Sequence, residues 1–180
     1  MENKYSMSTL AISAPEPSEY APYFGRYISL IGENDIITSL TRQVGTTLSY
    51  LRSLPETRGE FRYAPDKWSV KEVLAHVIDS ERVFAYRALS FARNDAALLP
   101  GFEQDDWMKA SAFDAVPLRE LIDEFEHLRL TNILFFKHLP NDAWMRRGVA
   151  SGNPFTVRSI AYIIAGHELH HLDILQKSYR

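Results

Sequence analysis

Apolar residues recur every three or four positions along much of the chain, which is the spacing of one face of an α-helix. Four segments show this pattern, and we expect helices over residues 35–53, 69–93, 117–139 and 156–177. Ser69 and Glu72 form a capping-box pattern at the start of the second helix, and Thr156 is the expected cap of the fourth. No strand pattern or internal repeat competes with these helices, so the sequence predicts an all-α protein.

The connection between the second and third helices, residues 94–116, is longer than the roughly 2–8 residues usual in helix bundles. We expect a short helix within it, at residues 105–112. A connection of this length can travel along the bundle and leave the second and third helices pointing the same way. The predicted fold is therefore a four-helix bundle with a long crossover between helices 2 and 3.

Residues 1–33 are expected to form an N-terminal arm packed on the bundle, and residues 34–180 the bundle domain itself. Pro15, Pro17 and Pro22 interrupt any helix in the arm. The arm is nevertheless too rich in aromatic residues for a free tail, and these are expected to lie across the bundle: Tyr20, Tyr23, Phe24 and Tyr27.

The bulk composition narrows the class of protein. A net charge of −3 and the lack of a basic stripe argue against nucleic acid as a partner. The absence of cysteine excludes disulfides, thiolate zinc sites and cysteine nucleophiles. The first 20 residues lack the apolar core of a signal peptide, and no apolar run approaches the ~20 residues that cross a bilayer. A cytoplasmic protein without a membrane partner is expected.

Three of the six histidines fall on core-facing stripes of the expected helices. His167 and His171 are four residues apart on the fourth helix, which is the spacing with which two histidines of one helix bind one zinc ion. His76 lies on the stripe of the second helix, which consists of Val73, His76, Val77, Ser80, Phe84 and Arg87. If these two helices are antiparallel, as the long linker permits, a rise of about 1.5 Å per residue brings the three histidines to one level.

A single histidine on an apolar face is most often a core residue with satisfied ring nitrogens. Three imidazoles at one level of a bundle are costly to bury without a shared ligand, because each ring carries two polar nitrogens. The sequence therefore favours a divalent metal on His76, His167 and His171. His170 is turned by about 100° from its neighbour and is expected outside the site. The remaining two histidines are expected at the surface: His127 and His138.

The residues around these histidines resemble the motifs of DinB/YfiT-like metalloproteins. The first motif is matched by Tyr63-Ala-Pro-Asp-Lys-Trp-Ser and the following residues through His76 to Arg82. The second is matched by Ala165-Gly-His-Glu-Leu-His-His-Leu. The similarity covers residues 20–178 and shows no departure at the three histidines. It implies a four-helix bundle with the same crossover, a zinc or nickel ion, and a homodimer.

Three nitrogen ligands leave a position on the ion for water or a small-molecule substrate, which is typical of catalytic zinc. The resemblance implies either a metal-dependent hydrolase, as in the YfiT branch, or an S-transferase that uses a low-molecular-weight thiol such as bacillithiol. Glu81 and Glu168 are candidate general bases, but neither is evidently directed at the ion. This favours S-transfer slightly, because a thiol brings its own nucleophile. The alternative is a non-catalytic metal-binding stress-response protein, for which we expect a site sealed by apolar side chains.

Overall fold

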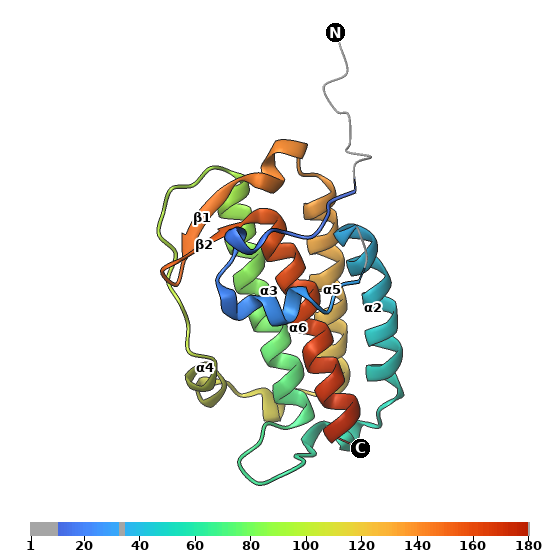
Figure 1. Ribbon diagram of the computed structural model, residues 1–180. Helices are drawn as coiled ribbons and strands as arrows, with labels where there is room; N and C mark the ends of the chain where they lie inside the picture. Colours follow the sequence, from blue (N-terminus) through green and yellow to red (C-terminus); the bar gives the residue numbers. More distant parts are fainter. Residues whose placement is uncertain (1–10, 33–34, 180) are drawn as a thin grey trace.

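Four long helices dominate the computed structural model, which describes residues 11–32 and 35–179 (Figure 1). They are α2 (Ile36–Ser53), α3 (Val70–Ala92), α5 (Leu118–Lys137) and α6 (Val157–Ser178). The four expected helices are thus confirmed to within two residues at each end. Residues 1–10 of the expected arm, and its boundary at residues 33–34, lie outside the described residues.

Side chains cap the start of three of these helices. The Asp35 carboxylate accepts a hydrogen bond from the Thr38 amide, at 3.0 Å, before α2. At α3, the Ser69 hydroxyl accepts from the Glu72 amide and the Glu72 carboxylate accepts from the Ser69 amide, so the expected capping box is present. Thr156 caps α6 in the expected way. Each cap satisfies an amide that the helix itself leaves without a partner.

The long helices do not simply alternate in direction. The end of α6 lies at the start of α3, where the Tyr179 hydroxyl donates to the Trp68 carbonyl at 2.7 Å, so these two helices are antiparallel. Near the start of α3, the Lys71 ammonium donates to the Asp114 carbonyl, just before α5, at 2.7 Å. Figure 1 shows residues 93–117, which include α4 (Gln104–Ala110) and η4 (Phe113–Ala115), passing from one end of the bundle to the other. The bundle thereby brings the middle of α3 against the middle of α6.

A β-hairpin precedes α6, so the prediction that the chain lacks strands is wrong for residues 147–156. Strands β1 (Arg147–Ala150) and β2 (Asn153–Thr156) pair in antiparallel fashion. Ser151 and Gly152 join them, with φ angles of 51° and 73°. Positive φ at both central residues is the geometry of a tight hairpin turn whose twist matches that of the strands. Four-residue strands are too short to show an alternating pattern in the sequence.

Residues 17–28 pack on the bundle and contain short helical turns that the prolines do not prevent. These are η1 (Pro17–Glu19), η2 (Pro22–Phe24) and α1 (Gly25–Ile28). Pro17 and Pro22 each occupy the first position of a turn, where no amide donor is needed. The buried Glu19 carboxylate pairs with Arg158 and accepts from the Thr156 hydroxyl at 2.7 Å, which attaches the arm to the start of α6.

Backbone contact between the arm and α6 depends on a glycine. A Cβ atom at Gly166 would lie 2.1 Å from the Tyr27 carbonyl oxygen, so no other residue fits there without movement. Because α1 covers its outer side, α6 is buried on all faces from Ser159 to Glu168. This packing holds Tyr27 beside the centre of the bundle.

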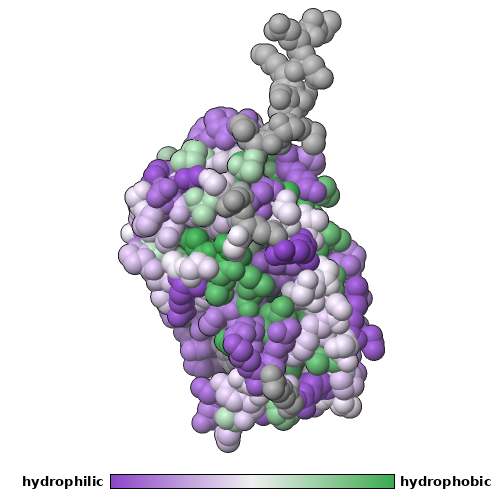
Figure 2. Space-filling view, turned by 45° about the vertical axis from the view of Figure 1, so that its right-hand side comes forward, coloured by the Kyte–Doolittle hydropathy of each residue, from purple (hydrophilic) through white to green (hydrophobic). Residues whose placement is uncertain are grey.

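Buried polar residues form a layer at mid-height between two apolar clusters of the core. On α3, Ser80 and Glu81 lie between Ile78 of one cluster and Phe84 of the other, and His76 lies one turn before Ser80. On α6, His167 and Glu168 lie between Ala165 and Leu175. The polar layer contains Thr47, His76, Ser80, Glu81, Arg129, Asn132, His167 and Glu168. Outside the core, Figure 2 shows a band of apolar side chains across the middle of one face, bordered by polar ones. Within the described residues, none of the helices has the length and apolar character needed to span a bilayer.

Candidate metal centre

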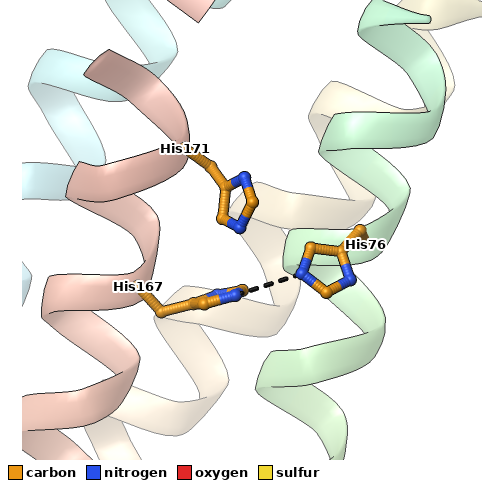
Figure 3. A group of neighbouring side chains, drawn as sticks. All are labelled: His76, His167 and His171. Atoms are coloured by element: carbon orange, nitrogen blue, oxygen red, sulfur yellow. Dashed lines mark hydrogen bonds between the residues drawn. The ribbon is translucent and has the colours of Figure 1, made fainter. Parts of the chain in front are cut away.

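Three imidazole rings converge from two helices (Figure 3). His76 projects from α3, two turns after its capped start, and faces His167 and His171, which are one turn apart on α6. The Nε2 atoms of His76 and His167 are 3.1 Å apart. One nitrogen from each of the three rings can be chosen so that all lie within 4.8 Å of one another. The three histidines selected by helical spacing therefore form one cluster.

The geometry fits a divalent ion. Zinc binds imidazole nitrogen at about 2.0–2.1 Å in tetrahedral geometry, which places two such ligands about 3.3 Å apart. The separation between the His76 and His167 nitrogens is close to this value, and a His171 nitrogen lies within 4.8 Å of both. The donor set is nitrogen only, which suits zinc, nickel and other borderline ions better than calcium or magnesium.

The three imidazoles are kept neutral by burial in the core, and the neutral form of histidine is the one that binds metal. His76 and His167 are only 5% and 7% exposed. Burial lowers the pKa of His76 to about 4. Burial and the neighbouring imidazole of His76 lower the pKa of His171 to about 3. Burial, followed by the charges of the adjacent histidines, holds the pKa of His167 well below its usual range. Protons therefore do not compete for these nitrogens near neutral pH.

Aromatic rings hold the imidazoles in place. The Trp68 ring lies 4.9 Å from the His76 ring, just before the cap of α3. The Tyr27 ring lies edge-on to the His167 ring at 5.3 Å, and Phe84 lies 6.3 Å from it on another side. His170 lies outside the cluster, as expected, with its ring 5.4 Å from Tyr27. The imidazole rings thus have little freedom to turn away from one another.

The two candidate bases, Glu81 and Glu168, lie in the polar layer and bind the guanidinium of Arg129. Arg129 donates to both carboxylate oxygens of Glu81, at 2.8 and 2.9 Å, and to one oxygen of Glu168. The Asn132 amide also donates to Glu81, and the Thr47 hydroxyl to Glu168. Burial alone would lower the pKa of Arg129, but the two carboxylates raise it by a larger amount. The pKa of Arg129 therefore lies above its ordinary value. All four carboxylate oxygens are therefore occupied.

An open cleft of about 170 Å³ reaches two of the three clustered histidines. His76 and His167 line it, and the arm contributes Tyr23 and Tyr27 to its wall. The other lining residues are Phe24, Ser80, Phe84, Arg87, Phe102, Gln104 and Ser151. None of these residues is acidic. The cluster is accessible from solvent, and the wall of its cleft offers hydroxyl, amide and guanidinium donors.

Comparison with known proteins identifies the family. The family model of the DinB superfamily matches residues 39–175 of this chain. The chain belongs to the DinB superfamily. The resemblance seen in the motifs around His76 and His167 is therefore confirmed. A comparison with curated protein sequences finds no match.

The fold of this DinB-superfamily chain is similar to that of a solved structure. YfiT from Bacillus subtilis, described as "a probable metal-dependent hydrolase with an unusual four-helix bundle topology", matches with a TM-score of 0.67. The match covers 91% of this chain and 89% of YfiT, at 13% sequence identity. At that identity the likeness establishes the four-helix bundle fold.

Two arginines near the centre of this DinB-superfamily chain have contacts that no pattern in the sequence indicates. Arg129 is 1% exposed, although a charged residue is normally excluded from a core stripe. Arg87 was placed on the stripe of α3 without a role, and it is 4% exposed. The only signal in the sequence was that each arginine occupies a position that helical spacing places among apolar residues. The partners of both side chains come from distant parts of the chain, so spacing alone does not reveal them.

Proposed function

We propose that this DinB-superfamily chain is a metal-dependent enzyme, with a zinc or nickel ion held by His76, His167 and His171. One observation carries this proposal: three neutral ring nitrogens lie together, and two of the three histidines, His76 and His167, line an open cleft. A structural zinc site is normally closed by four protein ligands, whereas a catalytic one leaves a position free. When bound, a divalent ion on three imidazoles supplies a Lewis acid that lowers the pKa of a water or thiol ligand.

The arm supplies groups that orient a substrate in the cleft. Burial and the neighbouring Tyr23 raise the pKa of Tyr27 to about 12, so its hydroxyl stays protonated at neutral pH. The Arg26 guanidinium donates to the Tyr27 oxygen at 2.7 Å, and the hydroxyls of Tyr23 and Tyr27 lie 3.5 Å apart, so the three groups form one hydrogen-bonding cluster on the cleft wall. Phe24 and Phe84 pack edge-on at 5.9 Å and exclude water from one wall.

Within this proposal, S-transfer from a low-molecular-weight thiol such as bacillithiol is the first candidate reaction. The cleft wall carries no carboxylate, and both candidate bases are bound to Arg129. Hydrolysis benefits from a general base beside the attacking water, whereas a thiol supplies its own nucleophile. Hydrolysis is the second candidate, favoured by the fold shared with YfiT. The open cleft argues against a purely structural, non-catalytic metal site.

Two measurements test the proposal. Purified protein should bind one zinc or nickel ion per chain, and His171→Ala should weaken binding by more than about 100-fold, because a direct ligand matters more than an outer-shell one. His138 is exposed, so His138→Ala is the matched control and should bind the metal normally.

The second measurement is turnover. Metal-loaded protein is assayed with bacillithiol and an electrophile, and separately with ester and amide substrates. Metal-dependent thiol conjugation supports S-transfer, and ester or amide cleavage alone supports hydrolysis. No metal-dependent turnover in either assay contradicts an enzymatic role.

We also propose that the protein forms a homodimer. Leu130 and Leu134 lie one turn apart on α5 and are 45% and 54% exposed. Apolar side chains that are adjacent on a helix surface are suited to contact with another molecule. Light scattering should give twice the chain mass for the wild type. A monomeric wild type would contradict the proposal, and Leu134→Lys tests whether this surface forms the contact.

A further inference from the structure

Arg87 is a buried cation that has no acidic partner within the part of the chain that the structure describes. Its guanidinium donates to the Pro100 carbonyl at 2.8 Å and to the Ser151 hydroxyl at 3.1 Å, and to no carboxylate among the described residues. Both of these acceptors are uncharged. Burial lowers the pKa of Arg87, with no carboxylate to raise it, yet arginine stays charged in proteins. A buried charge without a counter-ion is costly, so an anion that bound here would be stabilised strongly.

Arg87 lies on the face of α3 that carries the metal ligand. Eleven residues separate it from His76, which is three helical turns with an angular difference of only about 20°. Ser80 and Phe84 lie between them on that face, and all four side chains line the same cleft. The two Cα atoms are about 16 Å apart along the helix, a span that the long arginine side chain and an extended substrate can share.

Among the residues that line the cleft, only Arg87 carries a fixed charge, and that charge is positive. None of its lining residues is acidic, and Arg26, which stacks 3.9 Å from the centre of the Tyr23 ring, adds a second cation at its mouth. Arg26 donates only to the hydroxyls of Tyr23 and Tyr27 among the described residues. A cleft lined by one sign of charge between apolar walls attracts ligands of the opposite sign.

We propose that Arg87 binds an anionic group of the substrate, a carboxylate or a phosphate, while the reactive end of the same molecule reaches the three-histidine centre. The placement of the reactive end rests on the proposed metal site, but the binding of an anion at Arg87 does not. The guanidinium is suited to this role because it presents a planar pair of donors that match a carboxylate or phosphate. The flanking hollow of about 380 Å³, which shares Arg87 and Phe102 with the cleft and is also lined by Arg82 and Asp79, has room for the rest of the substrate beside the anionic group.

Matched thiols test the proposal on the cobalt-loaded protein. Mercaptohexanoate and mercaptohexanol differ only in the charged end, and each thiol should report its binding to the ion through a sulfur-to-cobalt absorption band. We expect the acid to bind more tightly than the alcohol in the wild type. In Arg87→Met this preference should disappear, with binding of the acid roughly 10- to 100-fold weaker. Arg87→Lys should retain part of the preference, because it keeps the charge.

Arg93→Met is the matched control, because Arg93 is an exposed arginine at the end of the same helix and its loss changes the net charge equally. It should leave the preference unchanged. If acid and alcohol bind the wild type equally, or if the preference survives in Arg87→Met, the proposal is overturned.

A metal-independent measurement separates this proposal from the proposed function. Glutarate is titrated into the metal-free wild type while the Arg87 Nε–H signal is followed by NMR. A saturable shift supports anion binding at Arg87 even if neither thiol binds the metal, in which case only the metal-dependent function fails. If glutarate leaves that signal unmoved, anion recognition at Arg87 is refuted, whatever the thiols do. Because this measurement uses the wild type, it also holds if Arg87→Met does not fold.

Discussion

Replacing Gly166 with alanine should destabilise the protein, although the same change in a helix usually stabilises it. Alanine in a helix interior is favoured over glycine by about 1 kcal/mol. At this position, however, the new methyl group would lie 2.1 Å from the Tyr27 carbonyl oxygen, where an ordinary contact of these atoms needs more than 3 Å. The arm and α6 must separate by about 1 Å, and overpacking of this kind typically costs about 1–3 kcal/mol.

The net effect follows from these two terms. Because the obstructing atom belongs to the backbone and cannot rotate away, we take the upper part of that range, which leaves a loss of about 1–2 kcal/mol. For a chain of 180 residues this corresponds to a melting temperature lower by roughly 2–8 °C. The variant should also bind zinc less tightly, because displacement of Tyr27 removes the ring that lies against His167.

Gly45→Ala provides the matched control for thermal unfolding. Gly45 lies in the interior of α2, and a Cβ atom there would meet nothing within 4 Å. This variant should therefore gain up to about 1 kcal/mol from helix propensity alone. The two substitutions are chemically identical and should shift the melting temperature in opposite directions. If Gly166→Ala is as stable as the wild type and binds zinc equally well, the arm does not press on α6 in the way described.

Two further predictions concern buried charges. Arg129→Met should lower the free energy of unfolding in urea by about 3–5 kcal/mol, because it leaves the carboxylates of Glu81 and Glu168 buried without a cation. Arg82→Met, which removes the half-exposed ion pair with Glu124, should cost no more than about 1 kcal/mol, and equal losses would contradict a buried network. Burial alone would raise the pKa of Glu19, but hydrogen bonds from Arg158, the Glu16 amide and Thr156 lower it by a larger amount. The pKa of Glu19 is therefore about 2, compared with its ordinary 4.5. A lowered carboxyl pKa stabilises the folded state above pH 4.5, and this contribution, on the order of 3 kcal/mol, is lost as the pH falls from 4.5 to about 2. Glu19→Gln should be less stable than the wild type at pH 7 and should show a shallower loss of stability across that interval; parallel pH curves for the two proteins would refute this assignment.

The elements that the sequence predicts well are those whose signals are local. Each long helix has an apolar stripe of several turns, and the caps at Ser69 and Thr156 mark their starts within one residue. His76, His167 and His171 were found because they interrupt such stripes with polar rings. Helical spacing was then enough to place two of them together, and the level of the third followed from the directions of the helices.

The features that the sequence did not predict depend on contacts between distant segments. The hairpin at residues 147–156 has strands of four residues, too short to carry a period, and its turn at Ser151 and Gly152 was the only local signal. The side chain of Arg129 is buried because Glu81 and Glu168 reach it from two other helices. The same cluster explains why the candidate bases are not free beside the histidines, which no local pattern indicates.

X-ray absorption spectroscopy of the zinc-loaded protein tests the central claim most directly, because it counts the imidazoles around the ion and measures their distances. We expect three nitrogen ligands from histidine at about 2.0–2.1 Å and at least one further light ligand that exchanges with added thiol. In His171→Ala the histidine count should fall to two. Two or fewer imidazoles in the wild type, or a fourth protein ligand that added thiol cannot displace, would contradict an open metal centre built by α3 and α6.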